Sequence, residues 1–379
     1  MRLLYLTYGT HSGIVDSHNA AFKAQGVTVS SFDASTGFDY RMKNVKLPSL
    51  HPINLLNTLI ALKRYGKDWQ WFYRRTDLAF RRMSSNARRY WKAQSENFDV
   101  VLQSGVLFHG APDRAKRKQP FLLHLDHTYA LSKHAPSVPS LRSACPASAE
   151  WEEMERRTYH DADWIFTMSE CVRDSLIQSY AVPAERITVV GGGPNFPELP
   201  LECPVPPIAP TVLFVGKDFS RKGGPVLLEA FRRVRAELPQ AQLLVVGPRT
   251  LGAEPGIVHY GTLSHAEMAD VYRQAQVFVL PSWREPFGIA FIEAMAFGLP
   301  CVGTRIEAIP EIIDEGRTGF LIPPGDANEL AVALLNLLQN PKRSAEMGAA
   351  GFAKVKAKLN WENTTKIMHA KMVGLTQQS

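Results

Sequence analysis

The sequence predicts an α/β protein made of two doubly wound domains. Its 379 residues exceed what one hydrophobic core normally supports. Each half also opens with an apolar strand, a loop that contains glycine and a helix-like stretch. In the first half the strand is Leu3 to Thr7 and the glycines are Gly9 and Gly13; in the second the strand is 211 to 216 and the loop is KDFSRKGG. This order of elements is typical of doubly wound parallel sheets.

A proline-rich stretch separates the two halves. Residues 194 to 210 contain seven prolines, a density that stiffens the chain and prevents regular elements. We therefore expect an N-terminal domain over 1–195, a hinge over 196–210, a C-terminal domain over 211–358 and a last helix over 359–379.

Composition limits the class of protein. A chain with 45% hydrophobic and 21% charged residues is ordinary for a globular protein, and no apolar run approaches the roughly 18 residues of a spanning helix. The four cysteines are Cys145, Cys171, Cys203 and Cys301. Their spacing predicts neither a zinc site nor a disulfide framework, which suits a cytoplasmic protein.

In the N-terminal half, candidate binding residues follow the predicted strands. The loop after the first strand lacks G-x-G-x-x-G and so is not a dinucleotide fingerprint; Gly13 is a candidate for ligand binding, although such turns also need glycine for structural reasons. Further strands at 99–103 and in FLLHLDHTYA place His127 at a carboxyl end, where open parallel sheets bind ligands. His109 and His124 are alternatives, and a histidine at a strand end is more often simply hydrogen-bonded.

Residues 55–94 have a local surplus of positive charge as large as the net charge of the whole chain. They contain ten basic and two acidic residues, whereas the whole chain has a formal net charge of +7. The aromatic residues among them are Trp69, Trp71, Phe72, Tyr73, Phe80, Tyr90 and Trp91. Such a segment suits an anionic membrane surface or nucleic acid. The alternative is a helix pair with a solvated basic face and aromatic residues in the core.

Asp161-Ala-Asp163 has the D-x-D pattern that can hold a divalent metal. A metal-binding D-x-D follows its strand, whereas this one precedes the predicted strand 164–168. We therefore predict a structural role for it and no metal site.

The segment PSWREPFGIAFIEAMAFG, residues 281–298, predicts an anion site. An apolar strand, 277–280, runs into a loop, and a buried helix starts near Gly288. A helix N-terminus presents unpaired N–H groups, and glycine lets an anion approach them. Glu285 and Glu293 flank this point and suit hydrogen bonds from sugar hydroxyls. The alternative is that Glu285 is a surface residue and Glu293 part of a structural salt bridge.

The motif EPFGIAFIE resembles the E-x7-E signature of the family 4 retaining glycosyltransferases, which have the GT-B fold. The loop after the second-domain strand is similar to the family pattern G-R-x-x-x-x-K-G, with Lys217 in place of arginine and Lys222 for the lysine. Family order continues to the C-terminus, except that Glu307-Ala308 replaces the commoner double glycine. The resemblance covers 99–379 closely and 1–98 in outline.

This resemblance implies two Rossmann-like domains facing across a cleft, with the last helix crossing back to the first domain. It assigns Glu293 to the ribose hydroxyls, Glu285 to the donor sugar, and His127 to the acceptor side of that sugar. The donor diphosphate would be held by Lys217 and Lys222 with the helix start at Gly288, and Arg221 could share that role. Gly13 would lie in the donor loop of the first domain, and Phe287 is a further substrate-binding candidate. Glu285, His127 and Lys222 are the catalytic candidates.

The implied activity is a retaining, metal-independent transfer from a UDP-sugar or GDP-sugar to a glycan or lipid-linked saccharide, without a cofactor. The cysteine spacing predicts a cytoplasmic location, and the basic and aromatic composition of 55–94 predicts peripheral docking on the inner face of the plasma membrane. No nucleic-acid partner is expected. Two other classes stay open: a non-catalytic basic adaptor for lipid or nucleic acid, and a GT-B phosphorylase or epimerase.

Overall fold

The computed structural model divides the chain into two compact units. It describes residues 1–9, 13–36, 39–42, 45–48, 52–66, 69, 73–133, 147–196, 198–204, 207, 209–247, 252 and 254–377. The described residues of unit 1 are those up to 133, 147–190 and those from 362 onward; unit 2 holds those between 191 and 361. The residues between Gly9 and Gly13, Lys67, Asp68, Trp71, Phe72, Cys145, Pro197 and Pro206 lie outside the described residues.

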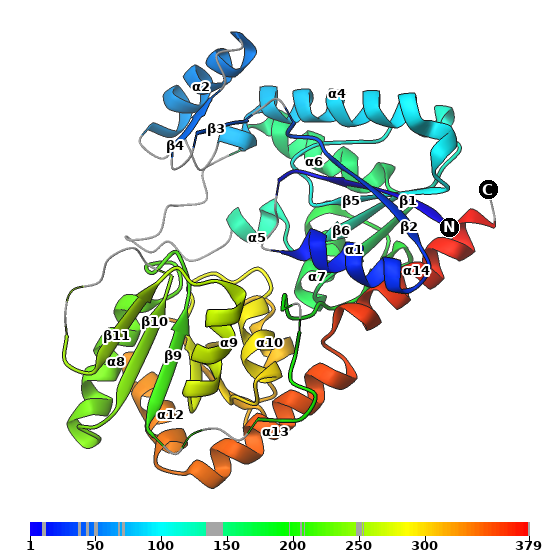
Figure 1. Cartoon of the computed structure of the whole chain (residues 1–379). Coiled ribbons are helices and arrows are strands. Elements are labelled where there is room, and N and C mark those ends of the chain that lie inside the picture. The colour runs from blue at the N-terminus through cyan, green and yellow to red at the C-terminus, as the bar shows by residue number, and fades with distance from the viewer. Residues whose placement is uncertain are drawn as a thin grey trace. The chain divides into compact units, whose positions relative to one another are not determined.

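Unit 1 is built on a six-stranded parallel sheet in the order β2-β1-β5-β6-β7-β8 (Figure 1). Its strands are β1 Arg2–Thr7, β2 Thr28–Asp33, β5 Val100–Ser104, β6 Phe121–Leu125, β7 Trp164–Thr167 and β8 Ile187–Val189. An antiparallel pair, β3 Asp39–Met42 and β4 Val45–Pro48, lies outside this sheet.

The helices of unit 1 come from both ends of the chain. They are α1 Ile14–Ala24, α2 Pro52–Tyr65, α4 Asp77–Gln94, α5 Tyr129–Lys133, α6 Ala149–Asp161, α7 Glu170–Tyr180 and α14 Trp361–Thr376. Short 3-10 turns are η2 Tyr73–Arg75, η3 Ser95–Asn97, η4 Arg114–Lys116 and η5 Ala184–Arg186.

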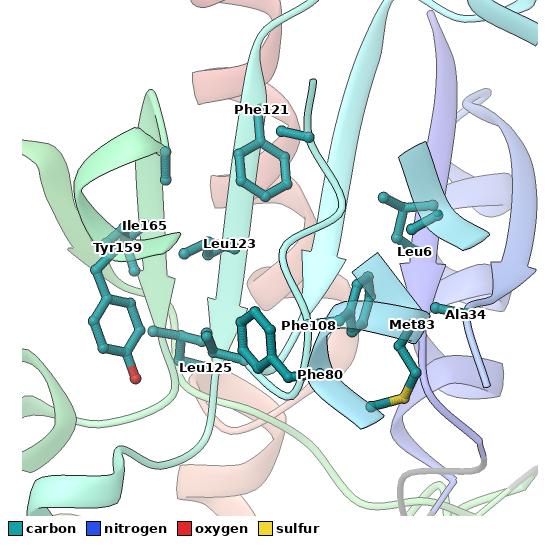
Figure 2. Packing of buried hydrophobic residues seen from close by; sticks show 14 of the residues in the cluster. Leu6, Ala34, Phe80, Met83, Phe108, Phe121, Leu123, Leu125, Tyr159 and Ile165 are labelled. Carbon is teal, nitrogen blue, oxygen red and sulfur yellow. The ribbon is translucent and has the colours of Figure 1, made fainter. Parts of the chain in front are cut away.

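Alternating side chains of the unit 1 strands form two cores, one on each face of the sheet. Leu4 and Leu6 of β1 pack on one face with Phe80 and Met83 of α4, as Figure 2 shows for Leu6, Phe80 and Met83. Leu3 and Tyr5 point to the other face, where they meet residues of α1 and α14: Phe22, Met368 and Met372. Because successive residues of a strand point to opposite faces, an unbroken apolar strand requires helices on both sides.

Unit 2 repeats the parallel six-stranded plan in the order β11-β10-β9-β12-β13-β14. Its strands are β9 Thr211–Val215, β10 Gln242–Val246, β11 Ile257–Gly261, β12 Val277–Leu280, β13 Cys301–Thr304 and β14 Gly319–Ile322. Its helices are α8 Gly224–Glu237, α9 His265–Gln274, α10 Ile289–Ala296, α11 Ile309–Ile312, α12 Ala327–Leu338 and α13 Pro341–Ala357. The predicted class of two α/β, doubly wound domains is confirmed.

The basic region 55–94 folds as α2, η2 and α4. Phe80, Trp91 and Tyr73 are buried in the core of unit 1, and Tyr90 stacks on Phe32 with ring centroids 4.1 Å apart. The described aromatic side chains of this region therefore pack inward, as the alternative of a helix pair with aromatic residues in the core predicts. Among the described residues, no helix is both long and apolar enough to cross a bilayer.

Candidate active site

Two loops of unit 2 interlock where the strand order reverses. β9 and β12 are neighbours in the sheet but not in sequence, and in open parallel sheets ligands bind at such a point. The loop after β9 touches the loop after β12 through Gly223, which has a φ of 77°; a Cβ there would lie 1.8 Å from the Pro281 carbonyl oxygen. Arg221 Nη1 also donates to the Arg284 carbonyl oxygen at 2.7 Å. Only glycine allows this approach, so the glycine fixes the distance between the two loops.

The interlocked loops bring Lys222 and Glu285 into a buried ion pair. Their side chains are only 13% and 8% exposed, and Ser282 Oγ donates to the same carboxylate oxygen at 3.1 Å. Burial lowers the pKa of Lys222, while the charge of Glu285 opposes that shift. The alternative of Glu285 as an ordinary surface residue does not fit, because the residue is only 6% exposed. A buried carboxylate needs a paired cation, and Lys222 supplies it.

The helix that follows this pair starts at Gly288. Gly288 is the N-cap of α10 with a φ of 105°, and no side chain caps the helix. The first N–H groups of the helix therefore keep their capacity to bind an anion. Phe287 is 5% exposed and belongs to the core, so its contribution is to fix the loop before the helix.

Glu293 lies in the second turn of α10 and has neutral partners. Its carboxylate accepts hydrogen bonds from the backbone N–H of Asn195 at 3.3 Å and from the Tyr272 hydroxyl at 3.2 Å. Burial raises the pKa of Glu293 to about 7, which these two donors only partly offset. These contacts differ from the structural salt bridge considered as the alternative, and an enclosed carboxylate of this kind suits further hydroxyl donors.

Aromatic side chains of unit 2 cluster around Tyr272, a hydrogen-bond partner of Glu293, a feature that the sequence analysis did not resolve. Tyr272 stacks on Phe297 with centroids 5.1 Å apart, and Phe196 contacts both rings. His265 lies 5.7 Å from Phe196. These residues come from three segments, so a pattern within one segment could not reveal them.

The two other candidate cations of unit 2 differ from Lys222. Lys217 directly follows Gly216 at the end of β9 and is exposed. Arg221 is partly buried and braces the loop through Arg284 and through Asp218, whose carboxylate lies 3.5 Å from Arg221 Nε.

Glu307 occupies the place where the family pattern has glycine. Its φ is 43°, in the left-handed region that favours glycine. Its carboxylate accepts a hydrogen bond from the backbone N–H of Glu285 and lies 3.9 Å from Arg284 Nε, while burial raises its pKa. The departure from the pattern was visible in the sequence, but its contact with Glu285 was not.

Two predicted site residues belong to unit 1. His127 follows β6, and its Nε2 lies 3.1 Å from Ser132 Oγ. Gly13 is the N-cap of α1 with a φ of 83°. The alternatives have structural partners: His109 lies 2.9 Å from Asp161, and His124 is buried against His18 with centroids 4.7 Å apart.

The segment after His127 is held by Glu155, which the sequence analysis missed. The Glu155 carboxylate accepts hydrogen bonds from the Tyr129 N–H at 3.1 Å and from the Tyr159 and Tyr180 hydroxyls at 2.9 and 2.6 Å. Burial raises the pKa of Glu155 to about 7, and these donors oppose the shift. Glu155 thus positions α5, the helix that begins two residues after His127.

Arg74 of η2 lies beside the first glycine loop rather than pointing away from the fold. A Cβ on Gly9 would be 3.0 Å from Arg74 Nη1. Arg74 and Arg75 also act electrostatically on Tyr8, lowering its pKa against the larger effect of burial. Both arginines are therefore near the carboxyl end of β1, which their position in a long basic segment did not reveal.

Asp161 and Asp163 both form ion pairs with arginine side chains. Arg117 contacts them at 2.6 and 3.1 Å, and Arg114 lies 2.9 Å from Asp163. Their role in unit 1 is therefore to join the segment before β6 to the segment before β7. Within the described part of the chain, no group of three or more His, Cys, Asp or Glu side chains is placed to hold a metal ion.

Comparison with known proteins gives the same picture for both units. Residues 59–193 match a family described as glycosyl transferase 4-like domain, and residues 209–340 match glycosyl transferases group 1. A D-inositol 3-phosphate glycosyltransferase of Corynebacterium kroppenstedtii is 29% identical over 60% of this chain and 56% of its own length. An MMP α-(1→4)-mannosyltransferase of Mycolicibacterium hassiacum is 27% identical over 86% and 84%.

Solved structures agree on the fold. A sucrose-phosphate synthase from Thermosynechococcus elongatus has a TM-score of 0.74, 21% identity and full coverage of both chains. The Anabaena protein HepE, solved with UDP-glucose, has a TM-score of 0.64 and 14% identity, with 99% of this chain and all of the other covered.

Two parallel doubly wound sheets with these structural neighbours define the GT-B fold. The chain belongs to the GT-B glycosyltransferases, since each unit matches a glycosyltransferase family. The predicted membership in the GT-B glycosyltransferases is thereby confirmed, while the roles assigned to Glu285 and Glu293 from EPFGIAFIE stay predictions. The matched region spans just over half the length of the inositol phosphate enzyme.

Proposed function

We propose that the protein transfers a sugar from a nucleoside diphosphate sugar to a saccharide, either free as a glycan or linked to lipid. The observation that carries the proposal is the arrangement in unit 2: a buried Lys222–Glu285 pair beside the N-terminus of α10, with Glu293 in the second turn of that helix. A cation and a helix N-terminus suit a diphosphate, and carboxylates on either side suit the hydroxyls of ribose and sugar.

In this proposal the reaction proceeds with retention and without metal. The bond between the anomeric carbon and the diphosphate oxygen breaks, and its electron pair stays on that oxygen. Lys222, Lys217 and the N–H groups of α10 stabilise the negative charge that develops. The acceptor hydroxyl forms the new bond on the same face of the sugar, and its proton passes to the departing phosphate oxygen.

The two glutamates orient the donor, and unit 1 supplies the acceptor side. Glu293 accepts hydrogen bonds from the ribose hydroxyls, and Glu285, held by Lys222, Ser282 and the Glu307 contact, accepts them from the sugar. His127 lines the acceptor side. A UDP-sugar or a GDP-sugar is the proposed donor, in keeping with the UDP-glucose complex of the Anabaena protein and the mannosyltransferase name of a relative. A cytoplasmic location with peripheral membrane association completes the proposal.

Calorimetric titration with UDP and with GDP tests the donor site, each in EDTA and in magnesium. We expect one nucleotide to bind equally well in both media. Glu293→Ala should weaken that binding by about tenfold or more, because hydrogen bonds to a charged group are worth about 1.5–3 kcal/mol. Glu237→Ala, at an exposed site on α8, should leave it unchanged.

Each contrary result removes a different part of the proposal. Binding that needs magnesium contradicts metal independence. Binding of neither nucleotide contradicts the donor site and favours a basic adaptor. Release of a free sugar phosphate when inorganic phosphate replaces the acceptor would favour a phosphorylase.

A further inference from the structure

Helix α2 is inverted relative to an ordinary surface helix: its buried side includes polar residues and its exposed side is apolar. The residues that face the rest of unit 1 are Asn54, Asn57, Ala61 and Tyr65. The exposed large apolar side chains are Ile53, Leu55, Leu56, Leu59, Ile60 and Leu62. A surface helix normally buries its apolar stripe against the core, whereas the apolar side of α2 is exposed in the part of the chain that the structure describes.

The orientation of α2 is fixed by hydrogen bonds on its buried side. Asn57 Nδ2 donates to the Tyr73 carbonyl oxygen at 2.9 Å, and the Tyr65 hydroxyl donates to that of Arg75 at 3.1 Å. The Thr76 hydroxyl donates to Asn57 Oδ1. If the helix were rotated to bury its leucines, the Tyr73 and Arg75 carbonyl oxygens and the Thr76 hydroxyl would lose these partners and face apolar side chains. Burying polar groups without hydrogen bonds is unfavourable. Figure 1 shows α2 near the start of α4, where these partners lie.

The exposed apolar side of α2 is concentrated in one place. In the part of the chain that the structure describes, eleven large apolar side chains are exposed, and six of them lie on α2 with exposed fractions from 36% to 64%. At 3.6 residues per turn, these six cover about half of the helix circumference. A contiguous exposed apolar surface of this kind indicates a binding surface.

The charges around α2 favour an anionic partner. The 14 residues of the helix include no acidic side chain, and its last turn carries Lys63 and Arg64. Arg64 lies 3.7 Å from the Asp77 carboxylate of α4, so Lys63 is the basic residue of the helix that an anionic partner would meet. Lys63 is exposed and lies on the apolar side, where its long stem can lie along lipid chains while the ammonium group reaches the headgroups. At the other end of the basic region, Arg89 and Lys92 of α4 are exposed too.

The length of α2 is too short to cross a bilayer. Fourteen residues give a helix of about 21 Å, whereas a span needs about 20 residues. Short helices with an apolar side and basic residues lie in the plane of the headgroup region.

We propose that α2 docks unit 1 on a lipid bilayer by inserting its leucine and isoleucine side chains among the lipid chains, with Lys63 contacting anionic headgroups. The docking element is therefore the aliphatic side of α2, whereas the described aromatic residues of 55–94 are in the core. The nature of the acceptor rests on the proposed glycosyl transfer. In that proposal His127 of unit 1 lines the acceptor side, so a unit 1 docked on a bilayer would meet an acceptor saccharide that is linked to lipid.

Vesicle flotation of the full chain tests this inference. We expect the protein to float with vesicles of phosphatidylcholine and phosphatidylglycerol, and about fivefold less with phosphatidylcholine alone, which is the effect of one basic residue near an anionic surface. Leu56→Glu with Leu59→Glu should lower flotation by at least about tenfold, since two apolar side chains no longer enter the lipid. Both sites are exposed, so the fold should persist.

The matched control places the same change on other exposed apolar residues. Leu201→Glu with Val332→Glu, at sites 86% and 66% exposed in unit 2, should float like the unmodified chain. Nucleotide titration of the α2 variant should give the unmodified affinity. Failure of the donor site would then appear as lost nucleotide binding, and failure of docking as unchanged flotation.

Two outcomes would overturn the inference. One is flotation of the α2 variant equal to that of the unmodified chain. The other is an unmodified chain that does not float but forms a dimer by light scattering, which the α2 variant does not form; the apolar side of α2 would then be covered by a second copy.

Discussion

The two sheets share a plan but place their candidate residues differently. In unit 2 the order β11-β10-β9-β12-β13-β14 brings the loops after β9 and β12 together, and a buried ion pair joins them. In unit 1 the candidates Gly13 and His127 follow β1 and β6, which are separated by β5. Buried charges must be paired, so the geometry of unit 2 is tightly determined. In unit 1 the buried charges support the scaffold instead: Glu155 holds α5, and Arg117 pairs with Asp161 and Asp163.

Substitution of Lys222 should give the largest effect on the buried ion pair that distinguishes unit 2 from unit 1. Lys222→Met should lower kcat/KM by about a thousandfold, because a preorganised cation at a developing charge is worth about 2.7–4 kcal/mol. It also leaves Glu285 buried without its cation, so the free energy of unfolding should fall by about 3–5 kcal/mol. Turnover of the nucleotide sugar and urea unfolding measure the two effects.

Lys217→Met provides the control for Lys222. Because Lys217 is exposed, its substitution should leave the free energy of unfolding within about 0.5 kcal/mol of the unmodified value. Equal loss of stability in the two variants would contradict the structural half of the comparison.

His127 tests the unit 1 side with a smaller effect. His127→Ala should lower turnover by about tenfold or more, since a misplaced reacting group costs rate rather than donor affinity. Calorimetric affinity for the nucleotide should stay as it is. A loss of nucleotide affinity without loss of turnover would assign His127 to the donor instead.

The raised pKa of Glu293 gives nucleotide binding a pH dependence, whereas Glu155 of unit 1, whose pKa is also about 7, should affect stability alone. The Glu293 pKa of about 7 in the folded chain lies above the ordinary value of 4.5, so ionisation is disfavoured on folding. Its contribution to the free energy of unfolding therefore falls as pH rises from about 4.5 to about 7 and is constant above. Nucleotide binding that needs the ionised carboxylate should weaken up to about tenfold for each pH unit below 7.

Titration of Glu293→Gln from pH 5 to 8 checks this assignment. The amide does not ionise, so the affinity should be weaker than that of the unmodified chain at pH 8 and nearly constant. A pH dependence that survives in Glu293→Gln would place the titrating group elsewhere.

Glu307 gives the smallest expected effect. Glu307→Gly relieves a left-handed backbone, which favours folding by about 1 kcal/mol, but removes the hydrogen bond to Glu285 N–H, worth a similar amount. The free energy of unfolding should change by less than about 1 kcal/mol, and KM for the donor should rise a few-fold. Donor KM within error of the unmodified value would show that Glu307 does not orient Glu285.

The sequence predicted those features that depend on nearby residues. Strand, loop and helix order predicted both sheets, and the spacing of Glu285, Gly288 and Glu293 placed them around one helix start. Contacts between distant segments could not be predicted in this way. The Glu307 bond to Glu285 and the support of α5 by Glu155 depend on tertiary packing.

The basic region shows the same limit. Charge and aromatic content suggested one surface, whereas packing buries Tyr73, Phe80 and Trp91. It also places Arg74 beside Gly9. The sequence of α2 shows that Asn54 and Asn57 lie on one side of the helix and most of its leucines on the other. Which side faces water depended on hydrogen-bond partners in η2.

The position of α14 determines when unit 1 can finish folding during synthesis. Met368 and Met372 cover the face of the sheet that carries Leu3 and Tyr5. The core on that face of β1, the first strand synthesised, is therefore complete only after α14, the last helix, has been synthesised. All of unit 2 leaves the ribosome in between and can complete its own core first. A released chain that ends before 362 would therefore hold one finished unit and one sheet with an uncovered apolar face.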